Sequence, residues 1–153
     1  MNREILFRGK RKDNGKWVEG FYSQFHNRPM TDEPNSHQIF ELIDEGVKLA
    51  GSCIGGYWHI VEAETVGQYT GLTDKNGKRI FEGDIVEGQC RSSWGGRLQR
   101  CVIAYGRDCF EARKYISYNG GERYYTYKVL FSRDVVVIGN IHDNPELLKG
   151  GEV

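Results

Sequence analysis

Short apolar runs separated by turns rich in glycine, asparagine and aspartate repeat along the whole chain. Runs of this length, bounded by such turns, are typical of antiparallel strands. The clearest case lies at residues 66–86, where two apolar runs flank Asp74-Lys75-Asn76-Gly77. Asn-Gly tolerates the positive φ of a tight primed turn, so we expect a hairpin with its turn at Asn76-Gly77. Gly83 interrupts the second run and predicts a bulge or a sharp bend.

The N-terminal region repeats this design. Residues 4–8 predict a strand, Asn14-Gly15 a second turn and residues 17–22 the returning strand. The segment 12–20 parallels 74–83, with one residue inserted. A duplicated unit and convergent turn chemistry both account for this echo, and we favour convergence.

Residues 36–43 are compatible with two structures. Three apolar positions have helical spacing, with Asn35 or Ser36 as a possible N-cap. The same stretch is rich in β-forming residues and is followed by a turn signal at 44–46 and another apolar run. We favour a strand–turn–strand hairpin.

The rest of the chain predicts further strands and one short helical turn. Strands are expected at residues 57–61, 98–105, 109–116, 124–131 and 135–139, and a helical turn starting at Pro145. The predicted fold is mainly β, or β-rich α+β. We expect a β-rich subdomain at residues 1–64 and a small antiparallel barrel of the SH3-like kind at residues 65–153.

Composition places the chain among globular proteins. Of its 153 residues, 39% are hydrophobic and 27% charged, which suits a folded domain rather than a disordered tail. No apolar run approaches the ~18–20 residues that span a membrane, and the N-terminus lacks the apolar region of a signal peptide. We therefore expect a cytoplasmic protein without a membrane partner.

The reactive residue types form no recognisable catalytic or metal-binding motif. The four cysteines contain no Cys-x-x-Cys pair, and we expect them to be reduced thiols packed as small hydrophobic side chains. Glu82 and Asp84 are close enough for a carboxylate pair, but solvated strand residues explain them better. No glycine-rich phosphate loop is present. We expect no enzyme activity, no catalytic residue, no cofactor and no metal.

Charge is unevenly distributed although the formal net charge is zero. Residues 1–87 carry 11 basic and 14 acidic side chains, residues 88–135 carry 9 and 4, and residues 136–153 carry 1 and 3. Residues 115–127 of this basic segment also hold five tyrosines, so the segment is a candidate for nucleic-acid contact. The residues that we expect to make such contacts are Arg97, Arg100, Arg113, Lys114, Tyr115 and Arg123.

Several motifs resemble the signature of the YopX family. They are Thr65-Val66-Gly67-Gln68-Tyr69-Thr70-Gly71-Leu72, then Asp74-Lys75-Asn76-Gly77-Lys78, and then Glu82-Gly83-Asp84-Ile85-Val86. The opening at residues 3–8 and the closing stretch at 137–148 are similar to the ends of that family, so the resemblance spans nearly the whole chain. It implies a small protein of a bacteriophage or prophage in a bacterial host cell. It carries no catalytic residue across to this sequence.

Two functions follow as hypotheses. The first is a protein-interaction or assembly module that forms homo-oligomers and can bind a host or phage protein, because short barrels expose strand edges and the charge segments suit subunit contacts. The alternative is a nucleic-acid-binding barrel of the SH3-like kind, with the basic segment as its contact surface. We favour the first.

Overall fold

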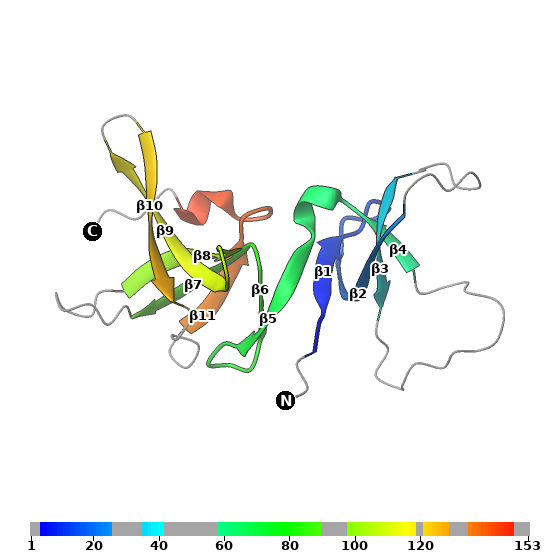
Figure 1. The fold of residues 1–153 in the computed structure, drawn as a ribbon, viewed down its shortest axis with the longest axis horizontal. Coiled ribbons are helices and arrows are strands. Elements are labelled where there is room, and N and C mark those ends of the chain that lie inside the picture. Colours follow the sequence, from blue (N-terminus) through cyan, green and yellow to red (C-terminus); the bar gives the residue numbers. More distant parts are fainter. Residues whose placement is uncertain are drawn as a thin grey trace. The chain divides into compact units, whose positions relative to one another are not determined.

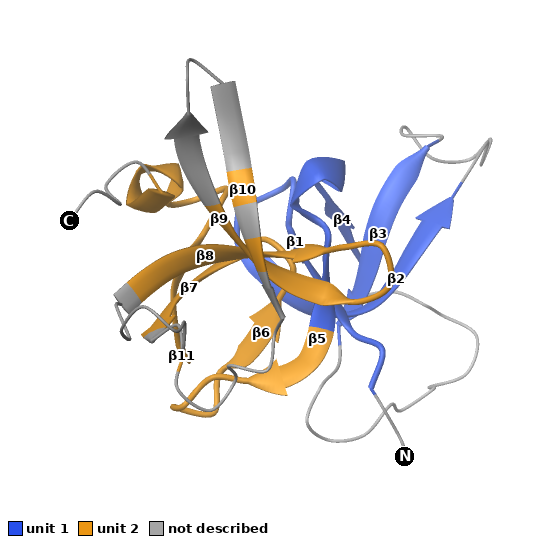
Figure 2. Ribbon diagram, turned by 60° about the vertical axis from the view of Figure 1, so that its left-hand side comes forward, with its two compact units in different colours: residues 1–69 blue, residues 70–153 orange. Residues whose placement is uncertain are grey.

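The computed structural model describes residues 4–25, 35–41, 58–89, 98–118, 121–128 and 135–148. The described chain is rich in strands and has two short 3-10 helices, which confirms the mainly β fold. It divides into two compact units, Met1–Tyr69 and Thr70–Val153, coloured separately in Figure 2. The boundary falls inside one strand, so the chain passes from one unit to the next without a linker.

Unit 1 is built from an antiparallel sheet, labelled in Figure 1. Its elements are β1 (Phe7–Lys10), β2 (Trp17–Phe25), β3 (Ser36–Glu41), β4 (Trp58–Val61), the 3-10 helix η1 (Ala63–Thr65) and the start of β5 (Gly67–Thr73). The strand order is β4-β3-β2-β1, and β1 pairs on its other side with the start of β5. The predicted hairpin around Asn14-Gly15 is confirmed, with Gly15 at φ +68°. Its first strand begins at Phe7 rather than at residue 4.

The uncertain segment at residues 36–43 forms a strand as far as Glu41, so the helical alternative is wrong there. Its pairing with β2 explains the outcome, since Tyr22 lies opposite Ile39 and both contribute to the core. The predicted turn and second strand after residue 41 lie outside the described residues.

The sheet of unit 1 curls until β4 meets the end of β1. Arg11 forms a bridge with Val61, the Lys12 N–H donates to the Ile60 carbonyl at 3.0 Å, and the Glu62 N–H donates to the Lys10 carbonyl at 2.9 Å. Val18, Ile39 and Val61 are buried inside this curl, with Phe7, Tyr22 and Val66 packed against them.

Unit 2 contains a five-stranded antiparallel sheet. Its elements are the end of β5, then β6 (Arg79–Phe81), β7 (Asp84–Gln89), β8 (Leu98–Tyr105), β9 (Phe110–Tyr118), β10 (Gly121–Lys128), β11 (Val135–Asn140) and the 3-10 helix η2 (Pro145–Leu148). The order is β10-β9-β8-β7-β11, and β6 pairs with β5. The predicted strands and the turn at Pro145 are confirmed, except that β10 begins at Gly121 and not at Tyr124, and that residues 129–131 of the predicted strand lie outside the described residues. Closure into an SH3-like barrel stays a prediction.

One face of the five-stranded sheet covers the core of unit 2. The buried residues are Ile80, Val86, Cys101, Ile103, Phe110, Ala112, Val135 and Val137, with Leu72 packed against them. Cys101 therefore behaves as the small hydrophobic residue that we expected. Cys109 does not, because it lies in the bend before β9 and is exposed. Cys53 and Cys90 lie outside the described residues.

The central hairpin turn differs from the predicted one. The Asp74 N–H donates to the Lys78 carbonyl at 2.8 Å, and the Gly77 N–H donates to the Asp74 carbonyl at 3.0 Å. Three residues, Lys75 to Gly77, therefore form the loop, where a two-residue primed turn was predicted. Gly77 has φ +82°, which is the left-handed position that closes a three-residue hairpin loop. The glycine at positive φ was predicted correctly, but the loop starts at Lys75 and not at Asn76.

Gly83 lies in the sharp bend that the sequence predicted. Its φ is +80°, and it separates β6 from β7. The Gly83 N–H donates to the Ile103 carbonyl at 2.8 Å, and its own carbonyl accepts the Ile141 N–H at 2.9 Å. The bend is therefore fastened to both β8 and the residue after β11. Among the described residues, no helix combines the length and apolar character that crossing a membrane would demand.

Candidate functional site

The two outer strands of the five-stranded sheet differ, and this difference defines the candidate site. At one side, the turn of the β5–β6 hairpin covers β11. Asp74 Oδ2 accepts the Val137 N–H at 3.1 Å, and the Lys75 N–H donates to the Val135 carbonyl at 3.0 Å. These are the groups with which β11 would otherwise pair with another strand. The turn thus occupies this edge from within the chain.

Further contacts of Asp74 hold the turn in place. Asp74 is buried, and its Oδ1 accepts the backbone N–H groups of Asn76 at 2.8 Å and Lys78 at 2.9 Å. Burial acts to raise the pKa of the Asp74 carboxyl, but the three donated hydrogen bonds and the nearby Lys78 outweigh it and the pKa is lowered. The group therefore stays ionised near neutrality and holds both the turn and the edge.

At the other side, β10 is the last strand in the order of the described sheet. All eight of its residues pair with β9, from Gly121 opposite Tyr118 to Lys128 opposite Glu111, without a shift in register. Natural edge strands are usually short, bulged, interrupted by proline or charged at their centre. β10 has no proline, and four consecutive residues between Arg123 and Lys128, Tyr124-Tyr125-Thr126-Tyr127, are uncharged. Tyr124 and Thr126 are exposed.

Arg100 is one of the predicted basic contacts, and the structure pairs it within the sheet. It lies on β8 directly opposite Glu87 on β7, and its Nε donates to Glu87 Oε1 at 2.9 Å. A terminal nitrogen also approaches the Leu147 carbonyl in η2 at 3.5 Å. The carboxylate comes from the acidic segment of the sequence, so pairing reduces the charge that Arg100 offers to a ligand.

Arg113 is the predicted residue with the richest surroundings. Its Nε donates to Glu111 Oε2 at 3.3 Å, and another nitrogen donates to the Tyr105 carbonyl at 3.0 Å. Its guanidinium carbon lies 5.0 Å from the centre of the Tyr124 ring, a cation–π contact. Tyr105 and Tyr124 are both 52% exposed. This cluster is the only part of the predicted basic surface that combines a cation with exposed rings among the described side chains.

The structure describes less of the other residues that were predicted to contact nucleic acid. The Lys114 ammonium donates to Gln99 Oε1 on the neighbouring strand β8. Tyr115 lies on β9 and Arg123 on β10, at positions set by the register, whereas Arg97 lies outside the described residues.

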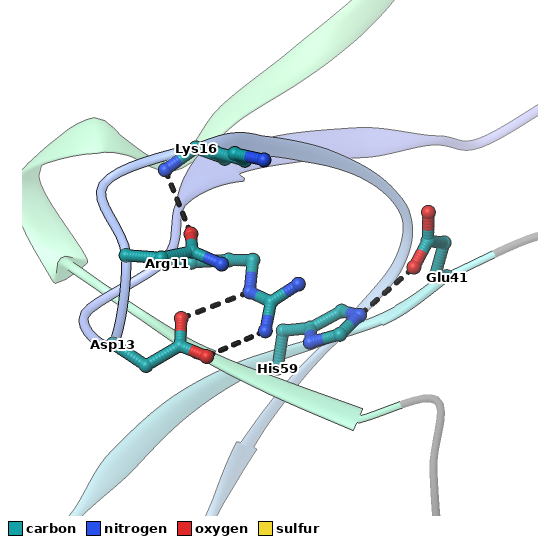
Figure 3. Close-up of polar contacts among 6 residues, drawn as sticks. Arg11, Asp13, Lys16, Glu41 and His59 are labelled. Carbon is teal, nitrogen blue, oxygen red and sulfur yellow. Dashed lines mark hydrogen bonds and ion pairs between the residues drawn. The ribbon is translucent and has the colours of Figure 1, made fainter.

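Unit 1 carries a separate polar cluster, shown in Figure 3. The Arg11 guanidinium donates twice to Asp13, and His59 Nε2 lies 2.8 Å from Glu41 Oε2. The hydrogen bond from Arg11 lowers the pKa of the Asp13 carboxyl, with burial opposing it. A histidine beside a carboxylate invites comparison with a catalytic pair. Glu41 is half exposed, however, and among the described residues the two belong to no group of three side chains that could hold a metal ion. The arrangement is that of a surface ion-pair cluster.

The acidic residues beside Gly83 were expected to be solvated strand residues, and for Asp84 this expectation is wrong. Asp84 is fully buried and accepts the Phe81 N–H at 2.8 Å, which closes the bend. Glu82 instead accepts the Tyr105 N–H at 3.2 Å. Both carboxylates therefore bind backbone groups on different elements. Among the residues that the structure describes, no group of three histidine, cysteine, aspartate or glutamate side chains is placed to hold a metal ion.

Comparison with known proteins agrees with the sequence motifs. The family model for the YopX protein matches residues 6–149. The chain belongs to the YopX family. No curated protein matches it. The crystal structure of protein EF1440 from Enterococcus faecalis is similar to this chain, with a TM-score of 0.52 and 25% sequence identity over 96% of this chain and 99% of that one. This YopX-family fold thus has a solved relative of nearly the same extent.

Sequence reasoning missed two contacts of the candidate site. Asp74 was read only as part of a turn, because its bond to Val137 joins residues 63 positions apart. The Glu87–Arg100 pair was missed because it depends on strand register. One signal was available for Asp74: an aspartate at the first position of a turn often accepts the N–H two residues on.

Proposed function

We propose that this YopX-family protein is an assembly module that forms homo-oligomers through its five-stranded sheet. The observation that carries the proposal is the contrast between β11, whose edge is occupied by Asp74 and Lys75, and β10, an eight-residue regular outer strand. A sheet that protects one edge and has a long regular strand with a four-residue uncharged run as its other outer strand is suited to strand addition. A second copy, or a host or phage protein, would supply the added strand.

As an assembly module the chain carries out no catalysis, and it acts in the cytoplasm of a bacterium. The support for this is that the acidic and histidine side chains described above bind backbone groups, arginines or one another. Glu82 and Asp84 illustrate this most directly, since each accepts a main-chain N–H.

Light scattering after size exclusion tests the proposal. We expect the purified protein to have the mass of an oligomer at micromolar concentration and physiological salt. Dilution should shift the mass towards that of the single 17.6 kDa chain. A mass that stays at one chain up to high micromolar concentration would contradict the proposal.

The alternative function, nucleic-acid binding, is favoured by one observation, the stacking of Arg113 on Tyr124 beside the exposed Tyr105. Aromatic rings with a neighbouring cation suit single-stranded bases. It ranks second because Arg100 and Arg113 both already bind carboxylates of the chain.

A further inference from the structure

We infer that two copies pair through β10 itself, antiparallel, with the two-fold axis at Tyr125. The inference rests on the proposed function and specifies its interface. It starts from the pairing of β10 with β9, which is regular over Gly121–Lys128 and leaves β10 as the outer strand of the described sheet. Antiparallel addition of the same strand from a second copy joins two five-stranded sheets into one, and two-fold symmetry closes the assembly.

The sequence of β10 is complementary to itself in this register. An axis at Tyr125 places residues whose numbers add up to 250 across from one another. Glu122 then lies across from Lys128 of the partner subunit, and Lys128 across from Glu122 of the partner subunit. Two opposite charges therefore face each other at each end of the paired segment, an arrangement that favours cross-strand pairing.

The positions between the charges also match. Tyr124 falls across from Thr126 of the partner subunit, and both are exposed in the single chain. Arg123 falls across from Tyr127 of the partner subunit, and Tyr125 across from its own copy. Aromatic residues opposite threonine, arginine or another aromatic residue are favourable cross-strand neighbours.

Neighbouring registers lack this match. Two-fold symmetry pairs only positions whose numbers add up to an even number, so the nearest alternatives place the axis at Tyr124 or at Thr126. The first places Glu122 across from Thr126 of the partner subunit, and the second places Lys128 across from Tyr124 of the partner subunit. Neither alternative pairs opposite charges, so the register at Tyr125 is preferred.

Charge-reversal variants of β10, measured alone and as a mixture, test the proposed interface. Glu122→Lys places two pairs of lysines across the axis, and Lys128→Glu places two pairs of glutamates there. We expect each variant alone to dissociate at least about tenfold more readily than the unmodified protein in sedimentation experiments. An equimolar mixture of the two variants restores both opposite-charge pairs, so heterodimers should form. The double variant E122K/K128E should also regain the dimer.

Glu146→Lys is the matched control, because it makes the same charge change at an exposed position of η2 in the same unit. It should leave the mass unchanged. Circular dichroism and thermal melts verify that each variant folds, and if one fails to fold, the double variant still reports on the register.

The outcomes distinguish the interface from the function. Monomeric variants that recombine on mixing support pairing through β10. An unmodified protein that oligomerises, with variants that behave like Glu146→Lys, would overturn the β10 interface while the assembly function stands. An unmodified protein that stays monomeric would overturn both.

Discussion

At Gly77, the backbone conformation alone determines which residue types the fold tolerates. Gly77 has φ +82°, and a Cβ added there would meet no atom within 4 Å. The cost of Gly77→Val is therefore conformational and not steric against neighbours. We expect a loss of about 1–3 kcal/mol in the free energy of unfolding, because a β-branched residue is strained at positive φ. A thermal melt measures it.

Gly77→Asn is the control for this prediction, since asparagine enters the left-handed region far more easily. It should lose much less stability than the valine variant. Equal losses for the two would mean that the side chain, and not the left-handed backbone, matters at this position. Gly15→Val should resemble Gly77→Val, because Gly15 has φ +68° and only the end of Lys10 close by.

Asp74 makes stability depend on pH. Its pKa in the folded chain is lower than in the unfolded chain, so its contribution is fully present above the unfolded value near pH 4. The contribution is lost as pH falls through the lower folded value. At pH 7 we expect Asp74→Asn to cost about 1–3 kcal/mol, because one acceptor oxygen becomes a donor facing buried N–H groups.

Urea unfolding at pH 7 and again near pH 3 measures this dependence. The gap in stability between the unmodified protein and the Asp74→Asn variant should narrow at the lower pH. A gap that is the same at both pH values would contradict the role given to the ionised carboxylate.

The packing of η2 on β11 depends on Gly139. A Cβ at this position would lie 2.6 Å from Asn144 Oδ1 and 2.9 Å from Leu147 Cδ1. The register of β11 on β7 also shifts between Val137 and Gly139, so the strand is already irregular there. We expect Gly139→Ala to lose about 1–3 kcal/mol through overpacking, measured by urea unfolding.

Asn144→Ala removes the nearest obstacle, so the double variant should lose less than the sum of the two single losses. Fully additive losses would show that η2 does not press on this glycine.

Strands and turns were largely predictable because their signals are local. The alternation of β2 and the positive φ of Gly15, Gly77 and Gly83 follow from neighbouring residues alone. The loop around Asn76 was misplaced by one residue because the Asp74 side chain, bound to Lys78 and to the distant β11, sets where the hairpin closes. Local propensity does not contain that contact.

The candidate site was less predictable, since it consists of relations between strands. The excess of basic residues is visible in the sequence, but Glu87 and Glu111 neutralise part of it through contacts that depend on register and side-chain direction. The position of β10 as the outer strand is likewise a property of sheet order. Its sequence was visible from the start, but its place at the end of the described strand order was not.

Charge across unit 2 decides between assembly and nucleic-acid binding. Residues 88–135 carry five more basic than acidic side chains, yet two of the predicted contacts, Arg100 and Arg113, bind Glu87 and Glu111. A carboxylate beside each guanidinium repels a phosphate and shortens the reach of the positive field. We therefore expect no shift of single-stranded DNA or RNA by micromolar protein at physiological salt.

A salt titration tests whether any binding of nucleic acid depends on contacts with phosphate groups. Binding that relies on phosphate neutralisation strengthens steeply as salt is lowered, because each neutralised phosphate releases counterions. Replacing Arg97, Arg100 and Arg113 with glutamate would then abolish it, while leaving the charges of β10 in place. Monomeric protein that shifts nucleic acid at physiological salt, weakens with added salt and loses binding in the triple variant would reverse our preference. An oligomer whose mass the triple variant leaves intact would instead place its contact at the strand edge.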